Sequence, residues 1–278
     1  MIQIKTREEL EAFRSNASGS VGFVPTMGAL HEGHESLILN AINNCDTTIV
    51  SVFINPTQFA PSEDYAQYPR IIDQDLKLCE RLGVQAVFTP NQDTVYPNQD
   101  RTAKYKPEKF LAEILCGKSR PHFFYGVCNV VERLFGLVQP THAYFGEKDL
   151  QQMVIVQKMV NDLNLNINVV SCPTIRDENG LALSSRNEYL DDDGYQKALN
   201  LSRALHDIKL HVRKNNWSVQ RARQFLAAEL EGRGLKGDYV DVFRPSTGRL
   251  VRSTIMPGDH CCAAVYVDNI RLIDNIKF

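Results

Sequence analysis

Short, nearly unbroken apolar runs alternate with amphipathic stretches over the first two-thirds of the chain. The runs at residues 21–24 and 48–54 are rich in β-branched residues, as expected of strands that are buried on both faces of a sheet. Apolar residues then recur at three- and four-residue spacing over residues 37–45 and 130–138, which predicts helices. This alternation favours an α/β fold with a doubly wound parallel sheet, of the Rossmann-like kind. Further strand-like runs occupy residues 86–88, 143–145 and 167–170.

The pattern changes after about residue 175. Helical periodicity over residues 196–214 and 219–231 is followed by strand-like runs that glycines and Pro257 separate. Two helices followed by short strands predict a second, smaller α+β domain. We therefore expect a Rossmann-like catalytic domain over residues 1–175 and a small C-terminal lid domain over residues 176–278. The later strand-like runs are residues 239–243, 263–267 and 271–273.

Composition excludes several classes of protein. With 43% hydrophobic residues among 278, the chain can build a sizeable core, and disorder is not expected. Its 31 basic and 33 acidic residues give a net charge of −2, so no bulk attraction draws it to nucleic acid or to an anionic membrane. We expect neither as a partner.

The N-terminus turns acidic at Glu8 and Glu9 and lacks the apolar segment of a secretory signal. No apolar run approaches the roughly 20 residues that a membrane-spanning helix needs. The seven cysteines are odd in number and form no Cys-x-x-Cys pair, so we expect reduced, mostly buried thiols rather than a zinc site. These features predict a cytoplasmic protein.

The segment Pro-Thr-Met-Gly-Ala-Leu-His-Glu-Gly-His at residues 25–34 lies between a predicted strand and a predicted helix. In a doubly wound sheet, ligands collect beyond the carboxyl ends of strands, where helix N-termini attract phosphate. His31 and His34, three residues apart, share a helix face and can donate hydrogen bonds to phosphate oxygens. Taken alone, the two histidines fit a surface pair or half of a metal site equally well. Their position after the strand favours phosphate.

Five further blocks carry amide, glycine, hydroxyl or charged residues: Phe53–Phe59, Tyr68–Arg70, Phe145–Gln152, Leu181–Asn187 and Arg271–Asn275. In their order and spacing, these blocks and residues 25–34 closely resemble the pantothenate synthetases, or pantoate–β-alanine ligases. This family belongs to the nucleotidylyltransferase superfamily, whose His-x-Gly-His motif is shared with class I aminoacyl-tRNA synthetases. The resemblance covers residues 21 to about 190 and one C-terminal block.

The resemblance implies an ATP-dependent condensation of pantoate with β-alanine. Pantoate and ATP would form pantoyl adenylate and pyrophosphate, and β-alanine would then displace AMP to give pantothenate. It also implies Mg²⁺ as a cofactor and a homodimer as the assembly. Asp73 and Asp75 lie near where the resemblance suggests magnesium, and Asp75 is our candidate ligand.

For ATP, the resemblance implies that Lys148 contacts the phosphates while Gly146 and Asp149 hold the ribose. Lys148 can otherwise be a solvated surface charge, and Asp149 a helix N-cap. Met27 and His34 are implied to contact ATP as well. A carboxylate that bridges ribose hydroxyls is common in doubly wound folds.

The run Ser184-Ser185-Arg186 supplies two hydroxyls and a planar guanidinium, which suit phosphate oxygens. By resemblance it is the phosphate-binding loop that accompanies the histidine motif. The alternative is a capping Ser-Ser followed by a surface arginine. The candidate catalytic residues are then His31, His34, Lys148 and Arg186.

For the acid substrate, the resemblance implies that Gln58 and Gln152 bind pantoate, with Met27 contributing backbone and apolar contact. Neutral amides can bind hydroxyls and a carboxylate together. Asn55 is a third candidate, although Asn55-Pro56 can also simply build a turn.

The chain departs from the family around residues 119–127. The family usually reads Arg-Pro-Gly-His-Phe-Arg-Gly-Val, and without a gap its Gly, His and Arg become His122, Phe123 and Tyr125. A customary Thr and Lys are Asn129 and Arg133. Since this segment borders the pantoate and β-alanine side, we expect ATP handling to survive and acceptor binding to be affected.

Two other functions fit parts of the pattern. One is a nucleotidylyltransferase that joins a nucleotide to a phosphorylated acceptor and makes no amide. The other is a non-catalytic nucleotide-binding protein, for which the changes at Phe123 and Tyr125 speak. Intact histidine, lysine and arginine blocks speak against the second. No residue in the sequence identifies a general base for β-alanine.

Overall fold

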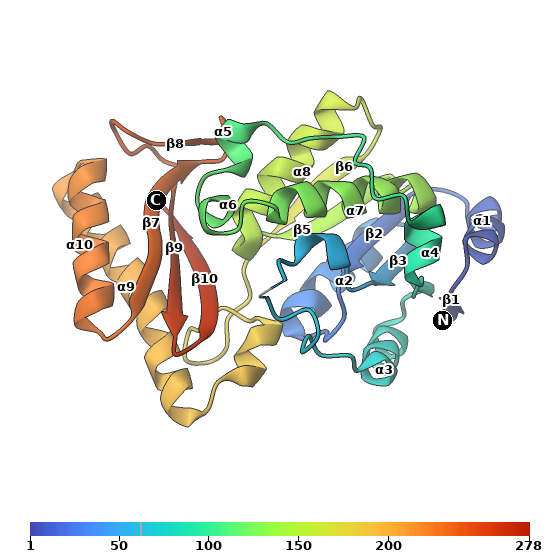
Figure 1. Cartoon of the computed structure of the whole chain (residues 1–278), viewed down its shortest axis with the longest axis horizontal. Helices are drawn as coiled ribbons and strands as arrows, with labels where there is room; N and C mark the ends of the chain where they lie inside the picture. Colours follow the sequence, from blue (N-terminus) through green and yellow to red (C-terminus); the bar gives the residue numbers. More distant parts are fainter. Residues whose placement is uncertain (62) are drawn as a thin grey trace. The chain divides into compact units, whose positions relative to one another are not determined.

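A computed structural model describes residues 1–61 and 63–278 (Figure 1). The contacts among these residues divide the chain into two units. The last change of unit falls between Pro173 and Thr174, close to the predicted boundary at residue 175. Two short segments that precede this boundary also belong to the second unit, and the single predicted boundary did not anticipate them. Unit 1 is Met1–Pro107, His122–Glu147 and Ile155–Pro173, and unit 2 is Glu108–Pro121, Lys148–Val154 and Thr174–Phe278.

Unit 1 contains a six-stranded, fully parallel sheet in the order β1-β4-β3-β2-β5-β6. This confirms the predicted Rossmann-like sheet. The apolar pattern missed β1, because the polar Gln3 interrupts its apolar run, whereas the equally short β4 is apolar throughout. The strands are β1 (Ile2–Ile4), β2 (Val21–Thr26), β3 (Thr47–Val52), β4 (Ala86–Phe88), β5 (His142–Gly146) and β6 (Asn168–Cys172).

Helices cover both faces of this sheet, because alternate strand residues point to opposite sides. Val24 and its neighbours pack under α2 and α3, while Phe23 meets Phe135 of α7 with ring centroids 6.3 Å apart. The helices of this part of the chain are α1 (Arg7–Asn16), α2 (Glu32–Asn44), α3 (Ile72–Leu82), α4 (Gln92–Val95), α7 (Phe123–Val138) and α8 (Leu150–Asp162), with 3-10 turns η1 (Pro56–Gln58), η2 (Pro97–Gln99) and η3 (Glu147–Asp149).

Strand β2 lies between β3 and β5 (Figure 1). The chain adds β3 and β4 on one side of β2 and then β5 and β6 on the other, so the order of the strands changes direction at β2. Among the described residues, β2 pairs with β3 along residues 21–26, but with β5 only through Gly22 and Phe23. The carboxyl ends of β2 and β5 therefore extend beyond their shared ladder. Ligands of open α/β sheets bind at such a switch point.

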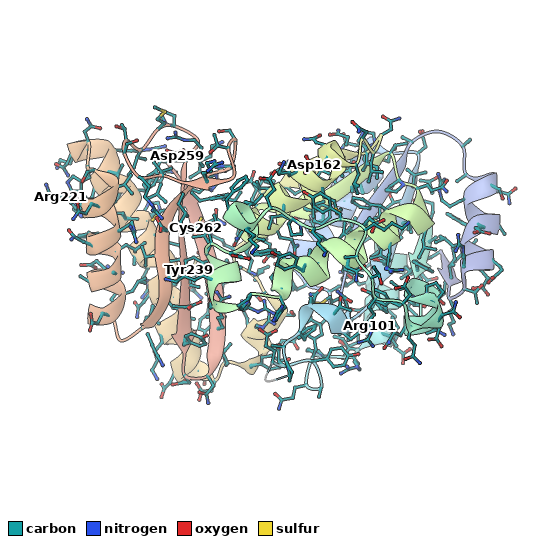
Figure 2. All side chains as sticks on the ribbon, turned by 45° about the horizontal axis from the view of Figure 1, so that its top comes forward. Arg101, Asp162, Arg221, Tyr239, Asp259 and Cys262 are labelled. Carbon is teal, nitrogen blue, oxygen red and sulfur yellow. The ribbon has the colours of Figure 1, made fainter. Side chains whose placement is uncertain are left out.

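Unit 2 is built on a four-stranded antiparallel sheet in the order β10-β9-β7-β8, against which α9 and α10 pack an apolar core. Figure 2 shows Tyr239 and Cys262 on two strands of this sheet. The predicted small α+β arrangement is thus present. Its elements are α5 (Lys109–Ala112), α6 (Cys116–Ser119), η4 (Ser185–Tyr189), α9 (Asp192–Asn215), α10 (Val219–Gly232), β7 (Lys236–Arg244), β8 (Arg249–Leu250), β9 (His260–Val267) and β10 (Ile270–Lys277).

All seven cysteines are free thiols, and six of them are buried. Burial raises the pKa of the Cys79 and Cys128 thiols to about 12, so both stay protonated and unreactive near neutral pH. Across residues 1–61 and 63–278, we find no helix whose length and apolar character would let it span a bilayer.

Candidate functional site

The loop that leaves β2 is held in place by a buried carboxylate. Asp75, in the first turn of α3, is 1% exposed and accepts the N–H groups of Ala29 and Leu30 at 3.1 and 2.8 Å. Gly28 and Ala29 both have positive φ, 86° and 51°, and such a conformation is costly for alanine. Asp75 therefore stabilises a strained turn immediately before the two histidines.

These contacts favour a structural role for Asp75 over the expected magnesium ligand. Both of its oxygens already accept backbone N–H groups. Within the part of the chain that the structure describes, no group of three or more His, Cys, Asp or Glu side chains could hold a metal ion. These contacts assign Asp75 to the support of the loop, and its role as a magnesium ligand stays a prediction.

Replacing Asp75 by alanine is expected to lower the free energy of unfolding by about 2–3 kcal/mol or more, because two N–H groups lose their buried acceptor. Denaturant unfolding measures the loss. Asp73→Ala is the matched control, since Asp73 is exposed in the same helical turn. A magnesium role would instead appear as an altered magnesium dependence of Asp75→Ala, without a stability difference from Asp73→Ala.

His31 and His34 both take part in capping α2. His31 is the N-cap residue, and its Nδ1 accepts the N–H of Gly33 at 3.1 Å. The Nδ1 of His34 in turn accepts the N–H of His31 at 3.3 Å. The two rings lie 4.1 Å apart. Because each Nδ1 is an acceptor, each neutral ring carries its proton on Nε2, the atom that can donate to a ligand. Capping thus fixes the tautomer of the pair.

Asn55 lies at the centre of a buried polar cluster beside this loop. Its Nδ2 donates to Oε1 of Gln58 at 3.1 Å, and its Oδ1 accepts the hydroxyl of Tyr96 at 2.7 Å. Gln58 donates from Nε2 to the sulfur of Met27 at 3.0 Å. Burial raises the pKa of Tyr96, which keeps the phenol a neutral donor. The structure therefore brings together three predicted residues, Met27, Asn55 and Gln58. It adds Tyr96, which no motif in the sequence singles out.

Asn55 builds a turn as well as a polar contact. It caps η1 by accepting the N–H of Thr57 at 3.2 Å, and it is 1% exposed. Its side chain is fully engaged with the protein, so it orients Gln58. The alternative interpretation from the sequence, a turn at Asn55-Pro56, is the one that these contacts support.

Helix α7 approaches the η1 turn so closely that only glycine fits at position 126. A Cβ on Gly126 would lie 2.3 Å from the carbonyl oxygen of Thr57 and 2.6 Å from the Cα of Gln58. The Gly126 carbonyl also accepts a hydrogen bond from Asn55 at 3.1 Å. The position of Gln58 is therefore set by the backbone of α7.

A cavity of about 320 Å³ lies at the carboxyl ends of β2, β3 and β4. Met27 and Phe53 line it, with Arg70 among the few charged groups. Arg70 donates to the carbonyl groups of Tyr65, Ala66 and Tyr68, which fixes the loop before α3. The cavity is large enough for a small organic acid.

The departures at Asn129 and Arg133 form a matched pair. Asn129 donates to the carbonyl of Arg101 at 2.8 Å and accepts from Nε of Arg133 at 3.0 Å. Arg133 donates to the carbonyl of Thr102 at 2.9 Å. Both replacements therefore hold the segment at residues 101–102.

Phe123 packs edge-on against Phe124, at 4.9 Å between ring centroids.

Lys148 and Asp149, in unit 2, belong to the η3 turn that begins with Glu147 directly after β5. The Lys148 ammonium lies 3.9 Å from an Asp149 oxygen, and the lysine side chain is 19% exposed against 47% for the aspartate. An ion pair this long is weak and leaves the charge of Lys148 available to an anion. Gly146, the predicted ribose contact, is the last residue of β5 in unit 1.

The adjacent glutamines of α8 have different roles. Gln151 is buried and donates to the carbonyls of Leu111 and Ile114, both at 2.8 Å, and it accepts the N–H of Cys116 at 3.1 Å. It anchors the segment at residues 108–121. Gln152, the predicted pantoate ligand, is half-buried in the same unit. The sequence alone could not separate the two side chains.

The predicted phosphate loop begins with a helix cap. Ser184 is the N-cap of η4, and its hydroxyl accepts the N–H of Arg186 at 3.3 Å. Ser185 is buried, whereas Arg186 is half-buried. The capping alternative is thus present for Ser184, and it orders the backbone that presents Arg186.

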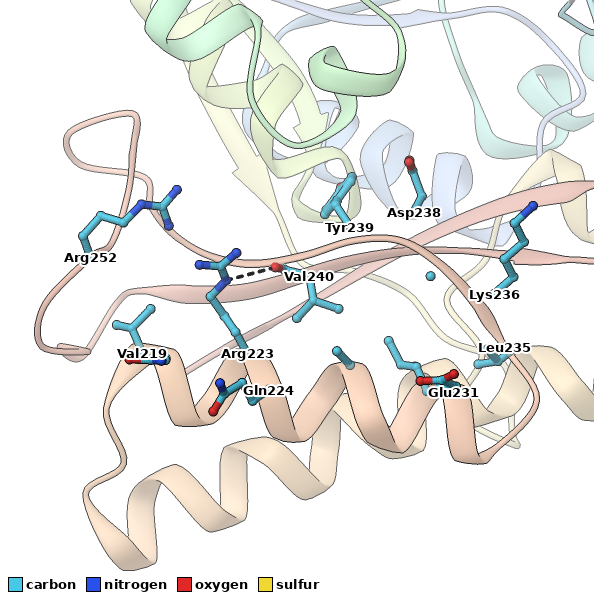
Figure 3. Close-up of a pocket in the computed structure, with 14 residues that line it drawn as sticks. Val219, Arg223, Gln224, Glu231, Leu235, Lys236, Asp238, Tyr239, Val240 and Arg252 are labelled. Atoms are coloured by element: carbon cyan, nitrogen blue, oxygen red, sulfur yellow. Dashed lines mark hydrogen bonds between the residues drawn. The ribbon is translucent and has the colours of Figure 1, made fainter.

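A second cavity, of about 880 Å³, lies between α10 and β7 of unit 2 (Figure 3). Its arginines are paired within the protein. Arg223 donates to the Val240 carbonyl and lies 3.5 Å from Asp241, which Arg252 also contacts at 2.9 Å. None of the predicted site residues lines this cavity. Volume alone therefore does not identify a site.

Comparison with known proteins identifies the family to which these residues belong. The family model described as pantoate-beta-alanine ligase matches residues 2–277. The chain belongs to this family. The histidine pair, the amide cluster of Asn55 and Gln58, and the turn that carries Lys148 thus occur in a family of ATP-dependent ligases. The predictions of family, fold and enzyme class are confirmed.

Relatives and solved structures of the family match nearly the full length. A pantothenate synthetase of Campylobacter fetus is 46% identical, with 98% of each chain covered, and one of Acetivibrio thermocellus is 40% identical at the same coverage. A Thermus thermophilus pantothenate synthetase structure aligns with a TM-score of 0.91 and 40% identity over 100% of this chain and 99% of that one. The structure of a Francisella tularensis pantoate-beta-alanine ligase is described as complexed with beta-gamma ATP and beta-alanine. It aligns with a TM-score of 0.84 and 33% identity over 100% of this chain and 97% of that one.

Proposed function

We propose that this protein condenses pantoate with β-alanine to give pantothenate, AMP and pyrophosphate through pantoyl adenylate. One observation carries the proposal beyond family membership. The capping arrangement of His31 and His34 places the proton of each neutral ring on Nε2, at the carboxyl end of β2 where doubly wound folds bind ligands. Two adjacent donors of this kind suit a phosphate group.

In the first half-reaction, a carboxylate oxygen of pantoate attacks the α-phosphorus of ATP, and the bond to the β-phosphate oxygen breaks to release pyrophosphate. Negative charge grows on the phosphoryl oxygens. We assign its stabilisation to His31, His34, Lys148 and Arg186, with Ser184 and Ser185 in the same ATP-binding set and with Gly146 and Asp149 at the ribose.

Magnesium enters this scheme with its nucleotide. Mg²⁺ keeps most of its water and is commonly bound through substrate phosphates. Because the described residues contain no group of three or more His, Cys, Asp or Glu side chains that could hold a metal ion, we propose that the ion arrives as the ATP complex.

Pantoate is assigned to the amide cluster of unit 1 and to Gln152. Gln58 is oriented by Asn55 and lies against Met27, so an amide and an apolar surface are adjacent. In the second half-reaction, the β-alanine amine attacks the acyl carbon, the acyl–phosphate bond breaks, and AMP leaves. Holding the two reactants together accounts for much of the acceleration.

The deciding assay follows AMP release from ATP in the presence of pantoate, with and without β-alanine. We expect pantoate-dependent ATP–pyrophosphate exchange without β-alanine, and stoichiometric AMP and pantothenate with it. A simple nucleotidylyltransferase would show no amide product, and a non-catalytic nucleotide-binding protein would show neither exchange nor product. Absence of pantothenate would reject the proposal.

A cytoplasmic location and a homodimeric assembly, both predicted above, remain proposals. Light scattering on the purified protein in solution distinguishes a dimer from a monomer, and fractionation of the producing cells tests the location. Neither nucleic acid nor membrane is proposed as a partner, because the net charge of −2 favours neither.

A further inference from the structure

The C-terminal block Arg271–Asn275 resembles the family but has no role in the scheme above. In unit 2 it forms part of β10, where Asp274 and Asn275 are 4% and 7% exposed. Two adjacent polar side chains this deeply buried need specific partners. Those partners lead to two different predicted ATP-binding segments.

Asp274 is bound by Arg176 in a two-pronged ion pair, with N–O distances of 2.6 and 2.8 Å. The same guanidinium donates to the carbonyl of Gly180 at 3.1 Å. Ile175 and Leu183 are also joined by a backbone hydrogen bond of 3.0 Å, so residues 175–183 form a closed turn. This turn leads directly into Ser184, and its position is therefore set by Asp274.

Asn275 makes the second connection. Its Nδ2 donates to the backbone carbonyl of Lys148 at 3.2 Å, and its Oδ1 lies 2.8 Å from Nδ1 of His260. Since the amide nitrogen is the donor to Lys148, the oxygen accepts from the histidine, and His260 carries its proton on Nδ1. The buried chain His260–Asn275 thus holds the backbone from which the Lys148 side chain extends.

We propose that Asp274 and Asn275 are positioning residues that keep the Lys148 turn and the Ser184–Arg186 loop at the spacing that ATP requires. The inference rests on the proposed function. Both segments belong to unit 2, so one short piece of β10 sets their separation. Neither residue needs to touch the nucleotide. A cation misplaced by a fraction of an ångström to 1 Å loses much of its effect on the reaction.

The chain offers a matched control for Asp274. Asp259 forms a two-pronged pair with Arg244 at 2.6 and 2.7 Å, and both aspartates have side chains 2% exposed. Each also accepts one backbone N–H, from Met256 for Asp259 and from Asn275 for Asp274. These partners of Asp259 belong to neither ATP-binding segment. Asp274→Asn and Asp259→Asn therefore remove equivalent charges at similar cost to folding.

The test measures pantoate-dependent ATP–pyrophosphate exchange and the unfolding midpoint of the full-length protein. We expect Asp274→Asn to lower kcat/KM for ATP at least tenfold, with KM for pantoate changed less than twofold. Asp259→Asn should leave both values within twofold of the unchanged protein, although its midpoint shifts by a similar amount. Equal kinetics in the two variants would overturn the inference.

A second variant keeps the test decisive if Asp274→Asn fails to fold. Asn275→Asp preserves size but replaces the donor to the Lys148 carbonyl by an oxygen. It should lower kcat/KM for ATP about tenfold, again with KM for pantoate retained, and unchanged ATP kinetics would exclude the Lys148 connection. Loss of exchange in the unchanged protein would instead reject the proposed function itself, so the two failures are distinguishable.

Discussion

Replacing His34 by asparagine is expected to lower pantoate-dependent ATP–pyrophosphate exchange by about 10²–10³-fold while the protein stays folded. Asparagine places Oδ1 near the position of Nδ1, so it can still accept the N–H of His31 that His34 accepts at 3.3 Å. It has nothing in place of Nε2, the proposed donor to phosphate. Loss of one preorganised donor to developing charge has about this effect on rate.

His31 allows the same separation of capping from catalysis. Asparagine is a strong N-cap residue, so His31→Asn should retain the start of α2, whereas His31→Ala should cost about 1 kcal/mol of stability in addition to activity. Exchange kinetics and denaturant unfolding are measured on all three variants. If both asparagine variants keep full exchange activity, the imidazoles serve α2 alone and their assignment to ATP is wrong.

Replacing Gly126 by alanine is expected to lower kcat/KM for pantoate about 100-fold and to destabilise the protein by about 1–3 kcal/mol. The added Cβ would lie 2.3 Å from the Thr57 carbonyl oxygen and 2.6 Å from the Cα of Gln58. Because both contacts are with backbone, the η1 turn has to move, and the Gln58 amide moves with it. Steady-state kinetics with varied pantoate report the effect.

Gly136→Ala on the same helix is the control. Gly136 is an exposed residue of α7, and no heavy atom outside its own helical turn lies within 4 Å of a Cβ built there. Alanine should stabilise the helix at this position by about 0.5–1 kcal/mol and leave the kinetics unchanged. A Gly126→Ala protein with unchanged KM and kcat for pantoate would show that the η1 turn does not bind this substrate.

The strands and helices could be predicted from the sequence, because the spacing of apolar residues and the order of the elements are properties of neighbouring residues along the chain. Each predicted strand of unit 1 falls on an observed one, and helices occupy the predicted stretches at residues 37–45 and 130–138. The strand at Ile2–Ile4 was missed because Gln3 interrupts its apolar run. The histidine segment was found because a motif of adjacent residues is visible before folding.

The sequence by itself determined the parallel sheet, the family and the motif residues, since these depend on neighbours along the chain. Tertiary structure decided what each polar group contacts. Asp75 supports Ala29 across 46 residues, Gln151 rather than Gln152 anchors residues 108–121, and Asn275 reaches Lys148 across 127 residues. A carboxylate or amide has the same composition in either role, and only burial and the identity of its partner distinguish a support from a ligand.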